Sequence, residues 1–121
     1  MPRVVHFEIP ADQPERAVAF YQKVFGWQCT RWEGPMPYWL VVTGTEGPGI
    51  DGGLMPRQTP GQGTTNVVDV ADIDQAVAAI VREGGTITAP KMAIPGVGQV
   101  AYAVDTEGNA FGVIQAEARG G

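Results

Sequence analysis

Residues 4–27, VVHFEIPADQPERAVAFYQKVFGW, join a strand pattern to a helix pattern. In residues 4–9 the side chains alternate between two faces, with Val, Phe and Ile on one and His and Glu on the other. From Gln13 to Phe25 apolar residues recur at helical spacing, and Gly26 follows as a residue suited to end a helix. The stretch therefore predicts a strand and then an amphipathic helix, with Asp12 as the expected N-cap.

A second version of this stretch occurs in the other half of the chain. ADQPERAV at residues 11–18 is similar to ADIDQAV at residues 71–77. TNVVDV precedes the second copy, as VVHFEI precedes the first. Each copy is followed by three strand-like runs, separated by turns that contain Gly, Pro or Asn. Internal repetition on this scale indicates a duplicated structural unit.

The sequence therefore predicts an α+β chain made of two tandem βαβββ modules. Module one is expected at about residues 3–56 and module two at about residues 64–117. Between them RQTPGQG, residues 57–63, is short, polar and rich in Gly and Pro, which is typical of a linker. A chain of 121 residues has the length of one domain, so we expect a single domain over residues 1–121.

The composition argues against two classes of partner. The formal net charge is −5 and no run of Lys or Arg occurs, so we expect no nucleic acid partner. No apolar stretch approaches the roughly 20 residues that cross a bilayer, and the N-terminal MPRVVHFEIP has no leader pattern. We expect a cytoplasmic protein with no membrane partner. Cys29 is the single cysteine, which leaves no internal disulfide, and we expect it to be a small packing residue.

Two motifs carry a resemblance to a known family. DQPERAVAFYQKVFGW at residues 12–27 and DTEGNAFGVIQ at residues 105–115 resemble motifs of the vicinal oxygen chelate superfamily, which includes glyoxalase I, bleomycin resistance proteins and extradiol dioxygenases. The resemblance extends over essentially the whole chain. It implies two βαβββ modules whose mixed sheets curve into a cup, with the helices outside and the ligand inside. It also implies a homodimer.

The resemblance further implies where a metal would bind in the metalloenzymes of that superfamily. Their ligands, usually His and Glu, come from the first and last strand of each module. His6 matches the first of these positions, whereas Asn66 falls at the equivalent place in module two, and Gly53 and Gly112 fall at the two last-strand positions. Because a catalytic Zn²⁺ or Fe²⁺ needs about three protein ligands, we expect no metal cofactor.

The remaining candidates for a site are polar, aromatic or very small. His6 and Glu8 share a strand face and are candidates for a binding or acid–base pair, and a carboxylate beside an imidazole is expected to raise its pKa. The alternative is that they form a satisfied polar pair or a dimer contact. Gly52, Gly53 and Gly112 either open volume for an organic ligand or mark a β-bulge or a close strand contact. The predicted ligand-binding residues are His6, Glu8, Trp39, Gly53, Asn66, Tyr102 and Gly112.

Three functions remain open on this scaffold, which hosts many chemistries. The leading hypothesis is a metal-independent protein of the bleomycin-resistance type that binds a small organic molecule. The second is a lyase, isomerase or dioxygenase-like enzyme with a rearranged metal site or a His6–Glu8 dyad. The third is a non-catalytic subunit or regulatory module that acts through its sheet surface.

Overall fold

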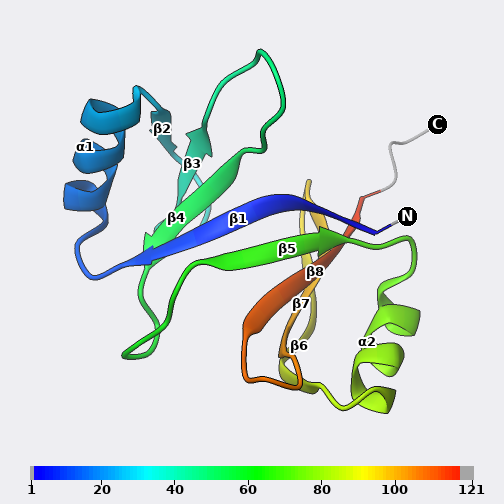
Figure 1. The fold of residues 1–121 in the computed structure, drawn as a ribbon. Helices are drawn as coiled ribbons and strands as arrows, with labels where there is room; N and C mark the ends of the chain where they lie inside the picture. The colour runs from blue at the N-terminus through cyan, green and yellow to red at the C-terminus, as the bar shows by residue number, and fades with distance from the viewer. Residues whose placement is uncertain (1, 118–121) are drawn as a thin grey trace. The chain divides into compact units, whose positions relative to one another are not determined.

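The elements of the chain follow the predicted repeat, as a computed structural model of residues 2–117 shows (Figure 1). Module one contains β1 (Arg3–Ala11), α1 (Pro14–Phe25), β2 (Gln28–Arg31), β3 (Trp39–Val42) and β4 (Gly52–Pro56). Module two contains β5 (Thr65–Asp69), α2 (Ile73–Arg82), β6 (Thr86–Ile94), β7 (Gly98–Val104) and β8 (Ala110–Ala116). The predicted βαβββ order is confirmed in both halves, and residues 57–63 form no helix or strand.

Two compact units divide the chain, at boundaries slightly different from those of the modules. One unit is His6–Thr65, and the other joins the first five residues to the chain from Asn66 onward. The division falls inside β1, so the first residues of this strand belong to the unit that contains module two.

Module one forms a mixed sheet with the strand order β2-β3-β4-β1. β1 is parallel to β4, whereas β3 is antiparallel to both β2 and β4. In the β1–β4 register Glu8 stands opposite Gly53, and Ile9 stands opposite Leu54. Because side chains alternate along a strand, His6 and Glu8 lie on one face of this sheet, and Ile9 and Leu54 on the other.

The helix α1 covers only the Leu54 face. Its residues Ala17, Val18 and Tyr21 pack with strand side chains around a core in which Leu54 and Val41 are fully buried. The amphipathic pattern of residues 13–25 predicted this contact, and Gly26 ends the helix with φ 73°, as expected. The opposite face of the sheet is named the His6 face below. It carries His6, Glu8, Tyr38, Leu40, Val42, Asp51 and Gly53.

The start of α1 differs from the prediction. Gln13, and not Asp12, is the N-cap residue, and its side chain makes no capping hydrogen bond. Asp12 lies one residue earlier, where its carboxylate forms an ion pair of 2.8 Å with Arg57. In module two the side chain of Asp72 does cap α2, because it accepts hydrogen bonds from the backbone N–H groups of Asp74 and Gln75.

Module two repeats the sheet with the order β5-β8-β7-β6, and β5 is parallel to β8. Val67 stands opposite Gly112, just as Glu8 stands opposite Gly53, and each pair of equivalent residues is separated by 59 positions. The same spacing makes Thr65 the equivalent of His6.

The helix α2 and the last hairpin complete this module. α2 packs Val77 and Ile80 around the buried residues Ile73, Ala101 and Val113. The predicted turn at residues 105–109 is confirmed by a hydrogen bond from the Asp105 backbone N–H to the Asn109 carbonyl, at 2.9 Å. Neither helix of residues 2–117 has the length and apolar content of a membrane span.

Candidate functional site

His6, Glu8 and Tyr38 form a polar cluster on the His6 face. The Tyr38 hydroxyl lies 2.9 Å from His6 Nε2 and donates to Glu8 Oε2 at 3.4 Å. When Tyr38 donates its only proton to Glu8, its oxygen accepts from His6, which requires the imidazole proton to be on Nε2. The three side chains then form a directed chain of hydrogen bonds from His6 to Glu8.

The loop before β3 holds Tyr38 in this place. The Trp32 backbone N–H donates to the Tyr38 carbonyl at 2.8 Å, which closes the loop. The Trp32 ring packs edge-on against the Tyr38 ring, with centroids 6.0 Å apart and an interplanar angle of 75°. The same indole lies so close to Gly34 that a Cβ there would overlap it. Tyr38 is therefore positioned by its own loop.

The Tyr38 phenol occupies the space beside Gly53. A Cβ at Gly53 would overlap both the hydroxyl and the ring carbons of Tyr38. The volume beside Gly53 is therefore filled by Tyr38 and is not open. The contact that fills it comes from a loop residue, rather than from the β-bulge or close strand contact that the sequence suggested. The place that a side chain of the last strand would fill on this face is thus filled by Tyr38.

Burial disfavours the charged forms of His6 and Tyr38. Desolvation lowers the pKa of His6 below its ordinary value of 6.5, against the opposing influence of Glu8 and Asp51. The predicted rise in the pKa of His6 is therefore wrong, because desolvation outweighs the nearby carboxylates. Burial, followed by the charge and hydrogen bond of Glu8, raises the pKa of Tyr38. Near neutral pH the cluster therefore presents an uncharged imidazole and an uncharged phenol.

Apolar side chains flank the cluster. Leu40 stands opposite Gly53 in the β3–β4 register and is 44% exposed, and Val42 is 37% exposed. Trp39, which was predicted to line the ligand site, lies on the other face, where it packs with the α1 core and under the Arg31 guanidinium. Alternation explains this, because Tyr38 and Leu40 flank Trp39 and point the opposite way.

In module two the equivalent positions carry different chemistry. A Cβ at Gly112 would lie 3.0 Å from the Tyr102 ring and 3.4 Å from a Val67 methyl group, so Tyr102 covers this glycine as Tyr38 covers Gly53. Thr65 and Val67 stand where module one has His6 and Glu8. Asn66 is exposed and lies on the opposite face of β5, shared with α2. Ligand contacts by Asn66, Tyr102 and Gly112 stay predictions.

Comparison with known proteins places this architecture in a family. Residues 3–113 match the sequence profile of the Glyoxalase/Bleomycin resistance protein/Dioxygenase superfamily. The chain belongs to this superfamily. A glyoxylase-like domain-containing protein of Didymella fabae is 30% identical to it over an alignment of 112 residues, with a coverage of 88% of this chain and 88% of that protein.

Solved structures show the same superfamily fold. A hypothetical protein from Bacillus halodurans C-125 has a TM-score of 0.74 at 12% identity, covering 99% of this chain and 98% of that chain. Methylmalonyl-CoA epimerase from Mycobacterium tuberculosis has a TM-score of 0.72 at 13% identity, covering 95% and 88%. At such identities the likeness concerns the fold alone, and it confirms the predicted α+β fold of two βαβββ modules.

The residues in place do not fit the metal site that the superfamily resemblance implies. Within residues 2–117 no group of three or more His, Cys, Asp and Glu side chains is placed to hold a metal ion. Gly53 and Gly112 supply no ligand, and a tyrosine covers each of them. Cys29 packs with the α1 core, and burial raises the pKa of its thiol, which disfavours the thiolate that binds metals.

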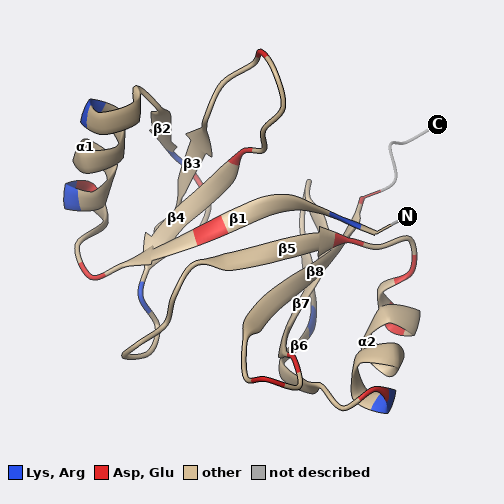
Figure 2. Ribbon diagram, in the orientation of Figure 1, with Lys and Arg blue, Asp and Glu red and all other residues tan. Residues whose placement is uncertain are grey.

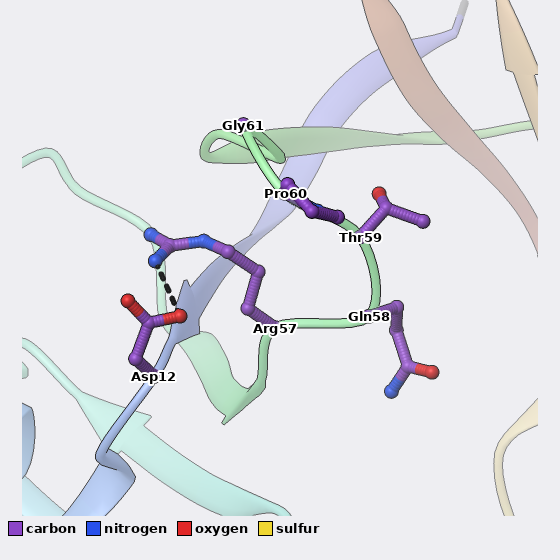
Figure 3. Close-up of a pocket in the computed structure, with 6 residues that line it drawn as sticks. All are labelled: Asp12, Arg57, Gln58, Thr59, Pro60 and Gly61. Carbon is purple, nitrogen blue, oxygen red and sulfur yellow. Dashed lines mark ion pairs between the residues drawn. The ribbon is translucent and has the colours of Figure 1, made fainter.

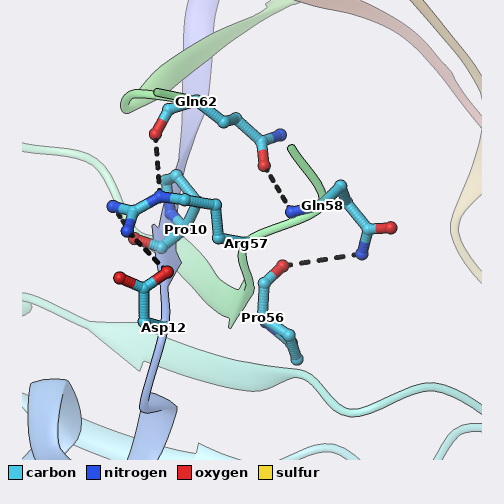
Figure 4. Close-up of polar contacts among 6 residues, drawn as sticks. All are labelled: Pro10, Asp12, Pro56, Arg57, Gln58 and Gln62. Atoms are coloured by element: carbon cyan, nitrogen blue, oxygen red, sulfur yellow. Dashed lines mark hydrogen bonds and ion pairs between the residues drawn. The ribbon is translucent and has the colours of Figure 1, made fainter. Parts of the chain in front are cut away.

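A separate surface hollow lies where β4 passes into the linker (Figure 3). Its Arg57 is engaged on three sides: with the Asp12 carboxylate at 2.8 Å, and as a donor to the carbonyls of Gln62 at 3.2 Å and Pro10 at 3.4 Å (Figure 4). These contacts fasten the linker to the end of β1. The hollow does not include the His6 cluster. It is lined by Asp12, Arg57, Gln58, Thr59, Pro60 and Gly61.

Proposed function

We propose that this protein binds a small organic molecule on the His6 face of module one, without a transition metal. The observation that carries the proposal is the Tyr38 phenol over Gly53. It replaces a last-strand side chain by an uncharged hydroxyl within hydrogen-bonding distance of His6. His6 and Glu8 alone provide fewer protein ligands than the three or so that a catalytic Zn²⁺ or Fe²⁺ site uses.

The His6 face has the mixture of groups that small-molecule sites use. Such sites combine apolar surface with a few polar anchors of fixed orientation. Here Leu40 and Val42 supply exposed apolar surface, and the linked side chains of His6, Tyr38 and Glu8 supply donors and acceptors. The anchors are oriented before any ligand arrives, because Tyr38 is fixed by its loop.

Titration with benzyl alcohol, followed by two-dimensional amide NMR, tests the location of this site. The probe has an apolar ring for Leu40 and a hydroxyl for the polar cluster. We expect saturable shifts centred on residues 38–42 and 52–54, weakened in His6→Ala and retained in Thr65→Ala, the matched change in module two. Shifts centred on α1 or on the Arg57 hollow, or no saturable shift, would contradict the proposal.

The other two hypotheses predict different results. A metal-dependent lyase, isomerase or dioxygenase requires about one tightly held metal per chain, and loss of His6 would release it. If the protein is a non-catalytic subunit that acts through its sheet surface, the small molecule should not shift the amide signals of the His6 face. The same NMR titration, together with metal analysis, therefore separates the three functions.

We also propose that the protein forms a two-fold homodimer. The physical reason is that β2 and β6 each end a sheet, so their outer edges present unpaired backbone groups to a second chain. Sedimentation velocity at micromolar concentration is expected to give the mass of two chains. A monomer under these conditions would contradict this proposal and leave the ligand site unaffected.

A further inference from the structure

We infer that a groove beside α1 binds small organic carboxylates that carry an aromatic or aliphatic body. This groove, named the α1 groove below, lies between the helix and the end of β1 and has a volume of about 450 Å³, which suits a small molecule. The helix covers the Leu54 face, so the groove is separate from the His6 face and the inference goes beyond the proposed function. The residues that line it include Ile9, Asp12, Arg16, Phe20, Tyr21 and Arg57.

One wall of the α1 groove is apolar. Phe20 is 56% exposed, and its ring packs edge-on against Tyr21, with centroids 5.2 Å apart and an interplanar angle of 87°. Tyr21 stacks on Trp27 at a centroid distance of 5.1 Å and packs with Ile9 around the α1 core. The exposed Phe20 ring therefore rests on packed neighbours. An apolar body that covers this ring removes apolar area from water.

Arg57 brings hydrogen-bond donors to the α1 groove. A guanidinium has five N–H groups. In Arg57 the two terminal nitrogens contact the Asp12 carboxylate and the Pro10 carbonyl, and Nε donates to the Gln62 carbonyl. Among residues 2–117 these partners leave one N–H on each terminal nitrogen for a ligand. Because Asp12 offsets its charge, Arg57 contributes hydrogen bonds rather than net charge.

Arg16 supplies the unpaired charge of the α1 groove. It is one of the two cationic residues of α1 (Figure 2), and its side chain makes no ion pair within residues 2–117. It lies one helical turn before Phe20, so the two side chains are neighbours on the helix surface. Asp12 is the one carboxylate among the described residues that line the groove, and it is paired with Arg57. The groove therefore has one cation in excess, which complements a monoanion.

A carboxylate on a short apolar body fits this combination. A guanidinium and a carboxylate match in shape and charge, and they form charge-assisted hydrogen bonds. A ligand whose carboxylate is separated from a ring by one or two carbons can contact Arg16 and Phe20 together, because these residues are neighbours. An ammonium ligand would face two guanidinium groups, and an alcohol would form only the weaker neutral hydrogen bonds.

Three probes with similar bodies and different charges test the inference: phenylacetate, 2-phenylethanol and phenethylammonium. Amide NMR titrations at neutral pH compare wild type with Arg16→Gln and with Lys23→Gln. Lys23→Gln is the matched control, because Lys23 lies on the same helix but does not line the groove. We expect saturable shifts centred on residues 9–21 and 57 with phenylacetate, and no saturable shift of these amides with the other two probes. The dissociation constant of phenylacetate should rise at least about threefold in Arg16→Gln, the scale of an exposed ion pair, and stay nearly unchanged in the control.

A second pair of variants tests the apolar wall. Val24 is 53% exposed on the same helix but does not line the groove, so Val24→Ala is the control for Phe20→Ala. We expect Phe20→Ala to raise the dissociation constant of phenylacetate at least about threefold, because the ligand loses apolar contact area. Val24→Ala should leave it nearly unchanged. Equal effects of the two substitutions would overturn the placement of the ligand body on Phe20.

Each remaining outcome bears on the inference. No saturable shift with phenylacetate overturns it and leaves the proposed function standing. Saturable binding of phenethylammonium or 2-phenylethanol in the groove overturns the carboxylate preference. Equal weakening of phenylacetate in Arg16→Gln and Lys23→Gln would indicate attraction by the whole helix and overturn the assignment to Arg16. If Phe20→Ala converts a dimer into a monomer in sedimentation velocity, a second copy of the chain covers the groove and the small-molecule assignment is overturned.

Discussion

The two modules share one framework and differ on one face of each sheet. In both, the first strand runs parallel to the last, a glycine of the last strand stands opposite the first, and a tyrosine covers that glycine. Module one surrounds this contact with His6 and Glu8, whereas module two has Thr65 and Val67. The duplicated framework is therefore the same in both copies, and a few side chains on this face distinguish one copy from the other.

The largest expected difference concerns the two glycines. We expect Gly53→Ala to lower the free energy of unfolding by about 2–3 kcal/mol, because its methyl group displaces the Tyr38 phenol from His6 and Glu8. Gly112→Ala is expected to stay within about 1 kcal/mol of wild type, since Tyr102 needs to move only slightly. Urea denaturation of both variants measures this. Equal decreases in the free energy of unfolding would show that the two tyrosine–glycine contacts are equivalent. The hydrogen-bonded cluster of His6, Glu8 and Tyr38 would then add no stability to module one.

The next comparison is His6 against Thr65. We expect His6→Ala to leave folding largely intact while weakening the binding of benzyl alcohol by roughly 1–3 kcal/mol, the scale of a lost hydrogen bond with its partner left unsatisfied. Thr65→Ala should leave the affinity unchanged. Thermal melts and NMR titrations of the two variants measure both quantities. A large loss of stability in His6→Ala with unchanged affinity would make His6 a structural residue.

A smaller expected effect is the pH dependence of the free energy of unfolding. It concerns module one alone, because His6 is the only histidine of the chain. Its folded pKa lies below its ordinary value of 6.5, so the unfolded chain binds more protons as the pH falls through that range. The free energy of unfolding should therefore decrease below about pH 6.5 and level off below the folded pKa. His6→Gln should lose less stability than wild type between pH 7 and pH 5, in paired urea denaturation series. Identical losses would contradict the burial of the imidazole.

Much of the fold could be predicted from the sequence because local patterns determine it. Helical spacing, the Gly26 cap and the 105–109 turn each depend on neighbouring residues, and the structure confirms them. The repeat was harder to align, because Asp12 and Asp72 match by residue type at a spacing of 60, whereas the strands match at 59. That single residue moved the expected equivalent of His6 from Thr65 to Asn66.

The same shift explains the wrong helix cap. At the correct spacing Gln13 is the equivalent of Asp72, and Asp12 is left outside the helix, where Arg57 pairs with it. An ion pair between residues so far apart in sequence leaves no local pattern. Gln13 was also missed because glutamine is not one of the residue types preferred at an N-cap, and its side chain makes no capping hydrogen bond.

The candidate site was predicted only in part. Alternation correctly placed His6 and Glu8 on one face, but it could not show that Tyr38 lies across Gly53, because a loop rather than a strand positions Tyr38. Trp39 was chosen instead, although it is one residue further along and faces the α1 core. Gly34 was the one signal in the sequence for the position of Tyr38. Its missing side chain allows the Trp32 ring to pack over the loop, where it contacts Tyr38.

Metal content tests the central claim most directly, namely that Tyr38 over Gly53 leaves module one without a metal site. Protein expressed in medium supplemented with zinc, nickel, iron and manganese is purified without a chelator and analysed by inductively coupled plasma mass spectrometry. We expect less than about 0.1 transition metal per chain, with the same value in His6→Ala and Thr65→Ala. About one transition metal per chain that is lost in His6→Ala and kept in Thr65→Ala would contradict it.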